Sequence, residues 1–476
     1  MSPSNTNRTA ARTKGHASRR RSRRGPLPTP EVRPNEASLT RFAGLVPMIL
    51  YMSETLLLPE LLRQAVGPNE GRRRLHPVPR VLFAFVVGAL AGISRMAHLE
   101  WLRDDVALQK YLRLSNWPVR KVFSSALTLV SDAAVARIEQ LVGLVGLLTL
   151  GDEPAIVVDV DNTAIVSYGT AEGAQFGYCG KGRRRRRHYP IVASVAASRA
   201  VVAAEYRDGS EMTTEDHIKF FGDVLVRVRA HVRKACNVIF RADSGFWSAG
   251  LATWLEASGE KFVFAYPLYP AIKLALWNAK FEALTDDEDI EFASLDGVQR
   301  ELEGKAFRVI VIRRRVLDYN APPQGKVIKW SPEWRYQAII ANMDWSPPDL
   351  WRFYNYRAES ERVFRIGKQA LGMAHLVGHD FRANRLAFLL RLLAYNADLS
   401  FHLHCEREAH RKNRPARRVG LEWRQVRFYL SPGRFLYQAG RWVLRTPLNK
   451  KLEELWAFYG SSLLRETSRA REVTSS

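Results

Sequence analysis

Apolar residues recur at intervals of three and four between residues 38 and 150, as they do from Leu45 to Val66. This spacing aligns them along one side of a helix, where they can be buried together. Pro77 and Pro79 mark a break between two helices. The pattern predicts an all-helical N-terminal domain over residues 38–150. Recognition of a DNA sequence is a candidate role for this domain, although it contains no clear helix-turn-helix pattern.

The pattern changes after Ala155 to short runs of β-branched residues. Three such runs, at 156–166, 188–198 and 200–209, predict three consecutive strands joined by turns. Helices and strands then alternate, with a helix predicted at 214–234, a strand at 237–244, a helix at 248–259 and a strand at 261–267. Three strands followed by such an alternation is the element order of an RNase H-like core.

Residues 271–348 interrupt this alternation. The segments 308–317 and 336–343 are typical of strands, and Pro-rich and Gly-containing turns surround them, so we predict a mostly β insertion. A helix predicted from Leu350 through Leu371 completes the core. The expected fold class is therefore α/β: an RNase H-like catalytic core interrupted by a mostly β insertion, with helical N-terminal and C-terminal regions. The expected domains after residue 150 are the core at 151–270 and 349–400, the insertion at 271–348, and a basic helical C-terminal region at 401–476.

The chain carries a large positive charge, because 72 Lys and Arg residues oppose 48 Asp and Glu residues, which gives a formal net charge of +24. Nucleic acid is the natural partner for such an excess. Residues 1–37 include the basic run Arg19–Arg24 and lack apolar periodicity, so we expect a disordered basic arm there. This arm is either a DNA contact or a solvated tail, and the sequence does not separate the two.

The three cysteines, Cys179, Cys236 and Cys405, are far apart and form no CxxC pair. This pattern argues against a zinc ribbon or a disulfide framework. The longest apolar run, Val81–Ile93, is shorter than the roughly 20 residues of a membrane-spanning helix. No apolar segment of the secretory type follows the basic N-terminus. We therefore expect a cytoplasmic protein without a membrane partner.

Two aspartates lie on predicted strands. Asp161 belongs to the first strand and Asp243 stands at the carboxyl end of the fourth, where active sites form in open α/β sheets. Converging carboxylates suit Mg²⁺, which prefers oxygen ligands. Asp159 lies on the same strand face as Asp161 and remains an alternative to it as the catalytic acid. Asp159 could instead be a supporting partner or a structural acid. Asp243 would also suit a simple turn, because Asp-Ser-Gly is common in loops.

A third acid belongs to a regular series of polar residues on the last predicted helix. Tyr354, Arg357, Glu361 and Lys368 follow one another at steps of three, four and seven, so a continuous helix would align them on one face. Such a stripe could bind a phosphate group. The alternative is a surface helix with salt bridges from Glu361 to Arg357 and Arg365.

The segment from Gly180 to His188 is dense in positive charge, and we predict a solvated or phosphate-bound loop between the first two core strands. DNA contact is favoured over solvation alone, because the planar fork of arginine suits phosphate. The cationic residues of this loop are Lys181, Arg183, Arg184, Arg185, Arg186 and Arg187. His375 and His379 are four residues apart without a third metal ligand, and a structural role is expected for them.

These motifs together resemble the DDE transposases of bacterial insertion sequences, in the superfamily defined by a Tyr-Arg-Glu-Lys signature. The resemblance is carried by the Asp-Asn-Thr at Asp161, the Ala-Asp-Ser-Gly around Asp243, and the signature spacing that begins at Tyr354. The segment 177–195, with its Gly-Tyr, basic and His-Tyr-Pro order, is also similar to that superfamily. The resemblance covers residues 156–372.

The resemblance implies that Asp161, Asp243 and Glu361 are catalytic and bind two Mg²⁺ ions, with Mn²⁺ as the alternative metal. It also implies that Tyr354, Arg357 and Lys368 hold the phosphates of the element ends. The reaction it implies is metal-dependent nicking at the element ends, followed by transfer of a 3′-hydroxyl into target DNA. The expected agent is a homodimer or higher oligomer on paired DNA ends, located in the bacterial cytoplasm with the nucleoid.

Some relatives excise through a DNA hairpin in which a flipped base stacks on an aromatic side chain. The candidates for that role are Trp330, Trp334, Trp345 and Trp351. Two other functions remain open: a transposase-derived DNA-binding protein without joining activity, and a nuclease of the same fold. Joined DNA products would distinguish a transposase from both.

Overall fold

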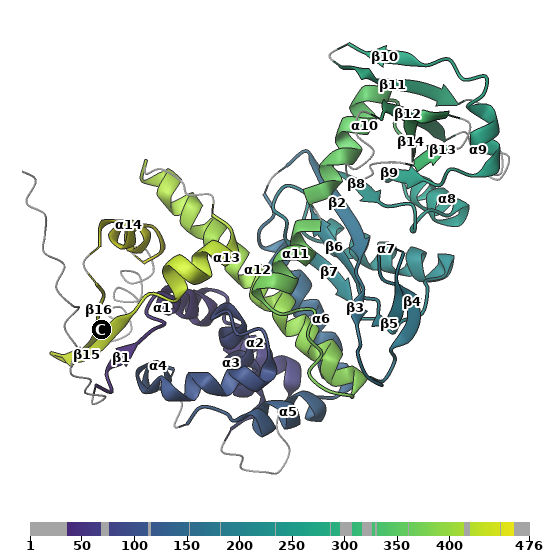
Figure 1. The fold of residues 1–476 in the computed structure, drawn as a ribbon. Coiled ribbons are helices and arrows are strands. Elements are labelled where there is room, and N and C mark those ends of the chain that lie inside the picture. The colour runs from purple at the N-terminus through teal and green to yellow at the C-terminus, as the bar shows by residue number, and fades with distance from the viewer. Residues whose placement is uncertain are drawn as a thin grey trace, which may run out of the picture. The chain divides into compact units, whose positions relative to one another are not determined.

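The structure is a computed structural model, and its helices and strands are labelled in Figure 1. It describes residues 36–67, 76–112, 116–151, 153–180, 182–233, 235–285, 287–295, 307–316, 326–328, 331–359, 361–413, 419–447 and 449–460. The basic arm predicted at 1–37 lies outside these residues, apart from its last two positions.

Helices are confirmed between residues 38 and 150, but the region is not all helical as predicted, because it begins with the short strand β1 (Leu39–Thr40). Two of them have proline in the first turn, where its missing N–H costs nothing, and Ser131 caps the last helix through the backbone N–H of Ala134. The helices are α1 (Leu45–Leu50), α2 (Leu58–Val66), α3 (Val78–Leu90), α4 (Val106–Tyr111), α5 (Arg120–Leu129) and α6 (Asp132–Leu147), with a π-helical turn at Tyr51–Thr55 and a 3-10 helix at Met96–Asp104.

The N-terminal helices share one apolar core with two helices from the other end of the chain, α12 (Phe381–Arg411) and α14 (Lys450–Tyr459). Asn396 on α12 connects this core to the main sheet, because it accepts the backbone N–H of Val201 at 3.0 Å and donates to its carbonyl at 2.7 Å. Gly146 on α6 lies so close to the same strand that a Cβ there would be 2.0 Å from the Val201 carbonyl oxygen. The helical layer is therefore fitted closely against one edge of the sheet.

The strands and helices predicted between residues 155 and 267 are confirmed in order. They are β2 (Ala155–Asn162), β6 (Ile191–Val195), β7 (Val201–Glu205), α7 (Thr214–Arg229), β8 (Asn237–Ala242), α8 (Ala249–Ala257) and β9 (Lys261–Tyr266). β6 and β7 follow β2 in antiparallel pairs, whereas β8 and β9 run parallel to β2 on its other side. Figure 1 shows these strands next to one another in the order β7-β6-β2-β8-β9.

The β-rich character predicted for the following segment is also confirmed, and its strands extend the same sheet. β14 (Ser331–Ala341) pairs antiparallel with β9, and the next strands outward are β12 (Arg308–Arg315), β11 (Asp287–Leu295) and β10 (Glu282–Leu284). A short helix, α9 (Pro270–Ala275), precedes them, and β13 (Lys326–Ile328) pairs with β14. The main sheet is thus a large mixed sheet with helices before and after it in the chain.

The prediction of a loop between the first two core strands is wrong. The chain there forms a second sheet from β3 (Ile165–Val166), β5 (Arg184–His188) and β4 (Gln175–Tyr178), in that order, and the arginine run is itself a strand. A run of identical charged residues has no apolar alternation, so its pairing with β4 cannot be seen in its own pattern. The first predicted strand accordingly ends at Asn162 rather than continuing to residue 166.

The C-terminal region is not all helical as predicted. After α13 (Leu421–Arg424), β15 (Gly433–Gln438) and β16 (Arg441–Arg445) form an antiparallel hairpin, and β15 also pairs with β1 (Leu39–Thr40). The hairpin turn, Ala439–Gly440, has positive φ at both residues, as in the turns whose twist matches paired strands. A helical prediction over this stretch missed that turn signal.

Among the described helices, no single one is long and apolar enough to span a membrane. Only the bent pair α1–α2 with its intervening π-helical turn meets that test of length and composition jointly, and most of the apolar side chains of this pair belong to the helical core.

His188 joins the small sheet to the helical core. Its side chain is fully buried, its Nδ1 lies 2.6 Å from the Tyr206 hydroxyl, and its Nε2 lies 2.8 Å from the Glu172 carbonyl oxygen. Burial lowers the pKa of the His188 imidazole, an effect only partly offset by the hydrogen bond to Glu172 and the charge of Asp208. The folded protein therefore favours neutral His188.

Acid is expected to destabilise the fold through His188. In the unfolded chain the imidazole has a pKa of about 6.5. Below that pH the unfolded chain binds a proton that the folded protein, with its lower His188 pKa, does not yet bind. The contribution is complete above about pH 6.5 and falls by up to about 1.4 kcal/mol per unit as the pH drops toward the lower folded pKa. Urea unfolding at neutral and acidic pH should show a shallower pH dependence in His188→Gln than in the wild type. The exposed His231→Gln should keep the wild-type slope, and an unchanged slope in His188→Gln would contradict the assignment.

Candidate active site

The polar residues of β2 lie on one face of the strand. Asp159 and Asp161 share that face, while Ile156, Val158 and Val160 on the other face are buried in the core with α7 and α8. The two-residue period of a strand produces this separation. Packing of the apolar face fixes the register of β2. The carboxylates on the other face are outside that apolar core and can serve as ligands or catalytic groups.

The structure brings Asp161 and Asp243 to one edge of the sheet. β2 and β8 run parallel with Val160 opposite Ala242, so the next residue along each segment is one of the two aspartates. The side chain of Asp161 is 14% exposed, and Asp243 is half-buried with its Oδ1 accepting the backbone N–H of Gly245 at 2.8 Å. The sequence-predicted pair is therefore adjacent and accessible.

Asp159 is occupied by a structural partner. Arg241, which lies opposite it on β8, donates from Nε and Nη2 to its two carboxylate oxygens at 2.6 and 2.8 Å. Both side chains are almost fully buried, at 1% and 2% exposure, and Arg241 Nη1 also donates to the Phe353 carbonyl at 2.5 Å. Since both oxygens of Asp159 are engaged, Asp161 is the accessible acid of this strand.

The single helix predicted from Leu350 to Leu371 is wrong. The chain forms α10 (Pro347–Asn355), a 3-10 turn at Tyr356–Glu359, and α11 (Glu361–Ala370). A 3-10 turn advances each residue by a larger angle than an α-helix, so the signature residues do not lie on one continuous helical face. The spacing of three, four and seven fits one continuous helix as well as two helices joined by a 3-10 turn. It therefore did not predict the end of α10 at Asn355.

The 3-10 turn places Arg357 between the acids and Tyr354. Its Nη1 lies 3.5 Å from Asp161 Oδ2, and its guanidinium carbon lies 5.7 Å from the centre of the Tyr354 ring. Burial lowers the pKa of Arg357, but Tyr354 and the charges of Asp161 and Asp243 raise it by more. Burial also raises the pKa of the Tyr354 hydroxyl, so this tyrosine stays protonated beside a fixed positive charge.

Lys368 approaches the same site from α11. Its Nζ donates to Thr163 Oγ1 at 2.6 Å and is 3.4 Å from the Ala164 carbonyl oxygen, just beyond the end of β2. Burial lowers the pKa of this ammonium group, and the charge of Asp161 opposes that effect. Tyr354, Arg357 and Lys368 thus converge on the aspartates, as the sequence predicted, although through two helices.

Tyr189 is a residue of this site that sequence reasoning did not select. Burial raises its pKa to about 12, with the Arg187 charge opposing and the charges of Asp243, Glu211 and Asp161 adding to the rise. The Arg187 guanidinium lies 3.5 Å above the Tyr189 ring. The His-Tyr-Pro order was the only signal for this residue, and it did not indicate that the ring lies close to both acids.

The arginines of the predicted basic loop differ in exposure. Arg183, Arg184, Arg185 and Arg186 are exposed, whereas Arg187 is fully buried and pairs with Glu211 at 2.5 Å. The expectation that this segment must be solvated or bound to phosphate is therefore wrong for Arg187, because an ion pair and an aromatic ring accommodate its charge. Lys181 lies outside the described residues.

The donor chemistry at the sheet edge fits a divalent cation, since Asp161 and Asp243 offer the carboxylate oxygens that Mg²⁺ prefers. Among the described side chains, no three His, Cys, Asp or Glu residues form a group that could hold a metal ion. Glu361 begins α11, but its side chain is outside the described part of the structure. Two of the three predicted ligands are thus adjacent.

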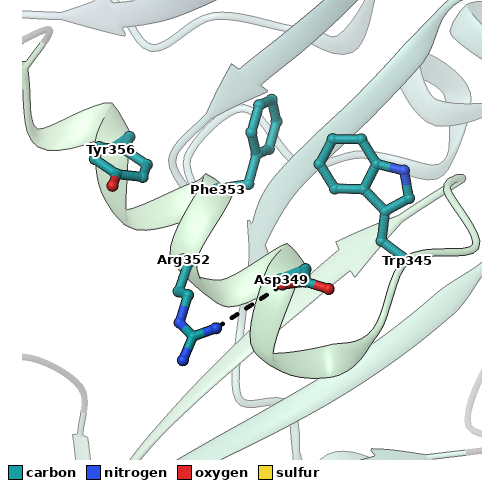
Figure 2. Close-up of a pocket in the computed structure, with 5 residues that line it drawn as sticks. All are labelled: Trp345, Asp349, Arg352, Phe353 and Tyr356. Atoms are coloured by element: carbon teal, nitrogen blue, oxygen red, sulfur yellow. Dashed lines mark ion pairs between the residues drawn. The ribbon is translucent and has the colours of Figure 1, made fainter.

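The tryptophans proposed for base stacking occupy different settings. Trp334 is buried, and the centre of its ring lies 4.4 Å from the Arg313 guanidinium carbon. Trp351 packs against Phe292. Trp330 lies outside the described residues. Trp345 is exposed and lines an open pocket of about 480 Å³ (Figure 2). The other residues that line this pocket are Asp349, Arg352, Phe353 and Tyr356, and Figure 2 marks the ion pair between Arg352 and Asp349 at 3.9 Å.

Comparison with known proteins gives one family match. The family model described as transposase DDE domain group 1 matches residues 32–419. Among solved structures, the chain is similar to a piggyBac transposase synaptic complex with hairpin DNA, at 9% identity over 82% of this chain and 79% of that chain, with a TM-score of 0.43. It is also similar to a Drosophila P element transposase strand transfer complex, at 13% identity over 44% and 43% of the two chains, with a TM-score of 0.21. A comparison with curated proteins found no match.

Proposed function

The chain belongs to the transposase DDE domain group 1 family, and from this we propose that it binds the ends of an insertion sequence and catalyses metal-dependent DNA cleavage and strand transfer. The observation that carries the proposal is the pairing of Asp161 with Asp243 at the carboxyl edge of β2 and β8, beside Arg357. This edge lies within the matched residues. The formal charge of +24 supports DNA as the partner.

The catalytic core in this proposal is RNase H-like and occupies residues 151–270 and 349–400. The antiparallel order β2-β6-β7 with β8 and β9 parallel to β2 supports it. Residues 271–348 are the β-rich insertion, and their strands continue the core sheet beyond β9. Residues 38–150 would recognise the element ends, and 401–476 would form a basic C-terminal region. The active form would be a homodimer on paired ends, in the bacterial cytoplasm with the nucleoid.

Asp161, Asp243 and Glu361 would hold two Mg²⁺ ions, with Mn²⁺ as the alternative. When bound, such ions activate a water or a 3′-hydroxyl for attack at phosphorus and stabilise the leaving oxygen. Two cations of the chain lie beside these acids: Arg357 pairs with Asp161, and Lys368 donates to Thr163.

The chain's own cations would position the phosphate. Arg357 presents a planar fork beside Asp161, and such a fork can donate two parallel hydrogen bonds to a phosphate. Lys368 is anchored by Thr163 and adds a second positive charge on the same side. The protonated Tyr354 hydroxyl would donate one further hydrogen bond. These groups would orient the scissile phosphate and offset its charge as the bond to phosphorus breaks.

Strand transfer separates this function from simple DNA cleavage. A labelled duplex that ends in a pre-formed 3′-hydroxyl at the element border would be incubated with a supercoiled target plasmid, Mg²⁺ and the full-length protein. We expect covalent joining of the labelled end to the plasmid. Cuts in the plasmid without any joined label would instead identify a nuclease, and binding without either product would identify a DNA-binding protein.

Lys368→Ala is expected to weaken binding to end DNA and to reduce its salt dependence. Loss of one phosphate contact should lower the slope of log affinity against log salt by about 0.9. Titrations of labelled end DNA at several salt concentrations measure this slope. Lys261→Ala is the matched control, because Lys261 is exposed at the opposite, amino end of β9 and should keep the wild-type slope. An unchanged slope in Lys368→Ala would remove the phosphate role and leave only its contact with Thr163.

A further inference from the structure

The β4–β5 hairpin exposes two aromatic side chains beside two arginines. Phe176 and Tyr178 are 67% and 56% exposed, and in the antiparallel register they lie opposite Arg186 and Arg184. Residues opposite one another in an antiparallel pair share one face, and so do residues two apart on a strand. All four side chains therefore lie on the same face of the hairpin.

The other face of the hairpin is occupied by Arg187. Its side chain lies against Gly177, where an added Cβ would be 2.4 Å from Arg187 Nε. Only glycine leaves room for this buried guanidinium, which stacks on Tyr189 and pairs with Glu211. Burial of Arg187 against Gly177 on this side fixes the orientation of the hairpin, and Phe176 and Tyr178 lie on the opposite side.

The exposed face has the chemistry of a nucleotide-binding surface. Within the described part of the chain, neither Arg184 nor Arg186 forms an ion pair with a carboxylate, so their charge is available to a polyanion. The Arg186 guanidinium carbon lies 5.9 Å from the centre of the Phe176 ring. Alternating aromatic and cationic side chains suit unpaired nucleotides, whose bases stack on the rings while the phosphates meet the arginines. Paired bases are already stacked on one another and gain little from such rings.

The hairpin is connected directly to the candidate active site. β5 ends at His188, and the chain continues through Tyr189 to Pro190, whose carbonyl accepts the backbone N–H of Thr163 at 3.1 Å. β5 also pairs with β3, which begins two residues after Thr163. Thr163 is the residue that holds Lys368. A DNA strand bound at Asp161 and Asp243 could therefore extend onto the hairpin, so that neighbouring nucleotides of the same strand contact both.

We propose that Phe176 and Tyr178, with Arg184 and Arg186, bind unpaired DNA nucleotides next to the active site. This inference rests on the proposed function, because it takes DNA as the substrate. It adds two stacking residues and a preference for unpaired over paired nucleotides at this surface.

Binding measurements on the full-length protein test the proposal, with divalent cations chelated so that no cleavage occurs. A labelled single strand and a duplex of the same length and composition would be titrated by fluorescence anisotropy. The Phe176→Ala/Tyr178→Ala double variant should lose single-strand affinity by roughly tenfold to a few hundredfold, because a stacked base contributes about 1–3 kcal/mol. Its duplex affinity should stay within about twofold of the wild type, since the arginines that meet phosphate remain.

Two further variants make the test specific. Phe176→Tyr/Tyr178→Phe keeps both rings and should restore single-strand binding, whereas Gln175→Ala changes the opposite face of the same strand and should leave it unchanged. Unchanged single-strand affinity in the double alanine variant, or equal losses for single strand and duplex, would overturn the inference. These outcomes are distinguishable from failure of the proposed function, which would appear as the absence of joined product in the strand-transfer assay, whether or not the wild-type protein binds DNA.

Discussion

Asp161→Asn is expected to reduce DNA cleavage about a thousandfold or more while binding to end DNA is largely retained. The substitution keeps the size of the side chain but removes the charge that would hold a divalent cation beside Asp243. Metal ions contribute several kcal/mol of transition-state stabilisation in such displacements, and each 1.4 kcal/mol changes the rate about tenfold. Single-turnover cleavage of labelled end DNA in Mg²⁺ measures the effect.

The matched control for this prediction is Asp223→Asn, because Asp223 is an exposed acid on α7 and has no place at the sheet edge. It should cleave at the wild-type rate. Asp243→Asn and Glu361→Gln should both behave like Asp161→Asn. Retention of cleavage in any of these three would remove that residue from the catalytic set.

Asp159→Asn is expected to destabilise the fold by about 3–5 kcal/mol, because it leaves the buried charge of Arg241 without its partner. The free energy of unfolding in urea measures this loss. In contrast, Asp159→Leu combined with Arg241→Met removes both charges, and it should be much less destabilised than the single variant. This comparison separates the cost of an orphaned charge from the cost of changed packing.

The same variant distinguishes the two acids of β2. At a temperature where Asp159→Asn remains folded, it should still cleave DNA, because Arg241 engages both carboxylate oxygens of Asp159 and we expect this acid to hold neither metal nor DNA. A destabilisation below about 1 kcal/mol together with lost cleavage would reverse the assignment and make Asp159 the catalytic acid.

The main sheet could be predicted from the sequence because its strands carry their own pattern. β2, β6, β7, β8 and β9 are short apolar runs bounded by turn residues, and this pattern indicates their positions along the chain. β5 could not be predicted in this way, because its five residues are four arginines and a histidine and its partners are β3 and β4. Its structure depends on tertiary contacts, above all the burial of Arg187 against Gly177 and Tyr189.

The candidate site could be predicted as a set of residues but not as a geometry. Residue types and spacing indicated Asp161, Asp243, Arg357 and Lys368, and the structure brings all four together. The partnership of Asp159 with Arg241 depends on the parallel register of β2 and β8, which a single strand's pattern does not contain. The 3-10 turn that directs Arg357 toward Asp161 could not be predicted either, because the residue spacing also fits a continuous α-helix.

The most direct test of the account is the incubation of full-length protein with labelled DNA that carries the borders of its own gene, with and without Mg²⁺, beside Asp161→Asn. The account predicts cuts at the borders that require Mg²⁺ and that disappear in Asp161→Asn, although the variant still binds the DNA. Border cuts of equal yield in Asp161→Asn, or binding by the wild type with no cut at any Mg²⁺ concentration, would contradict it.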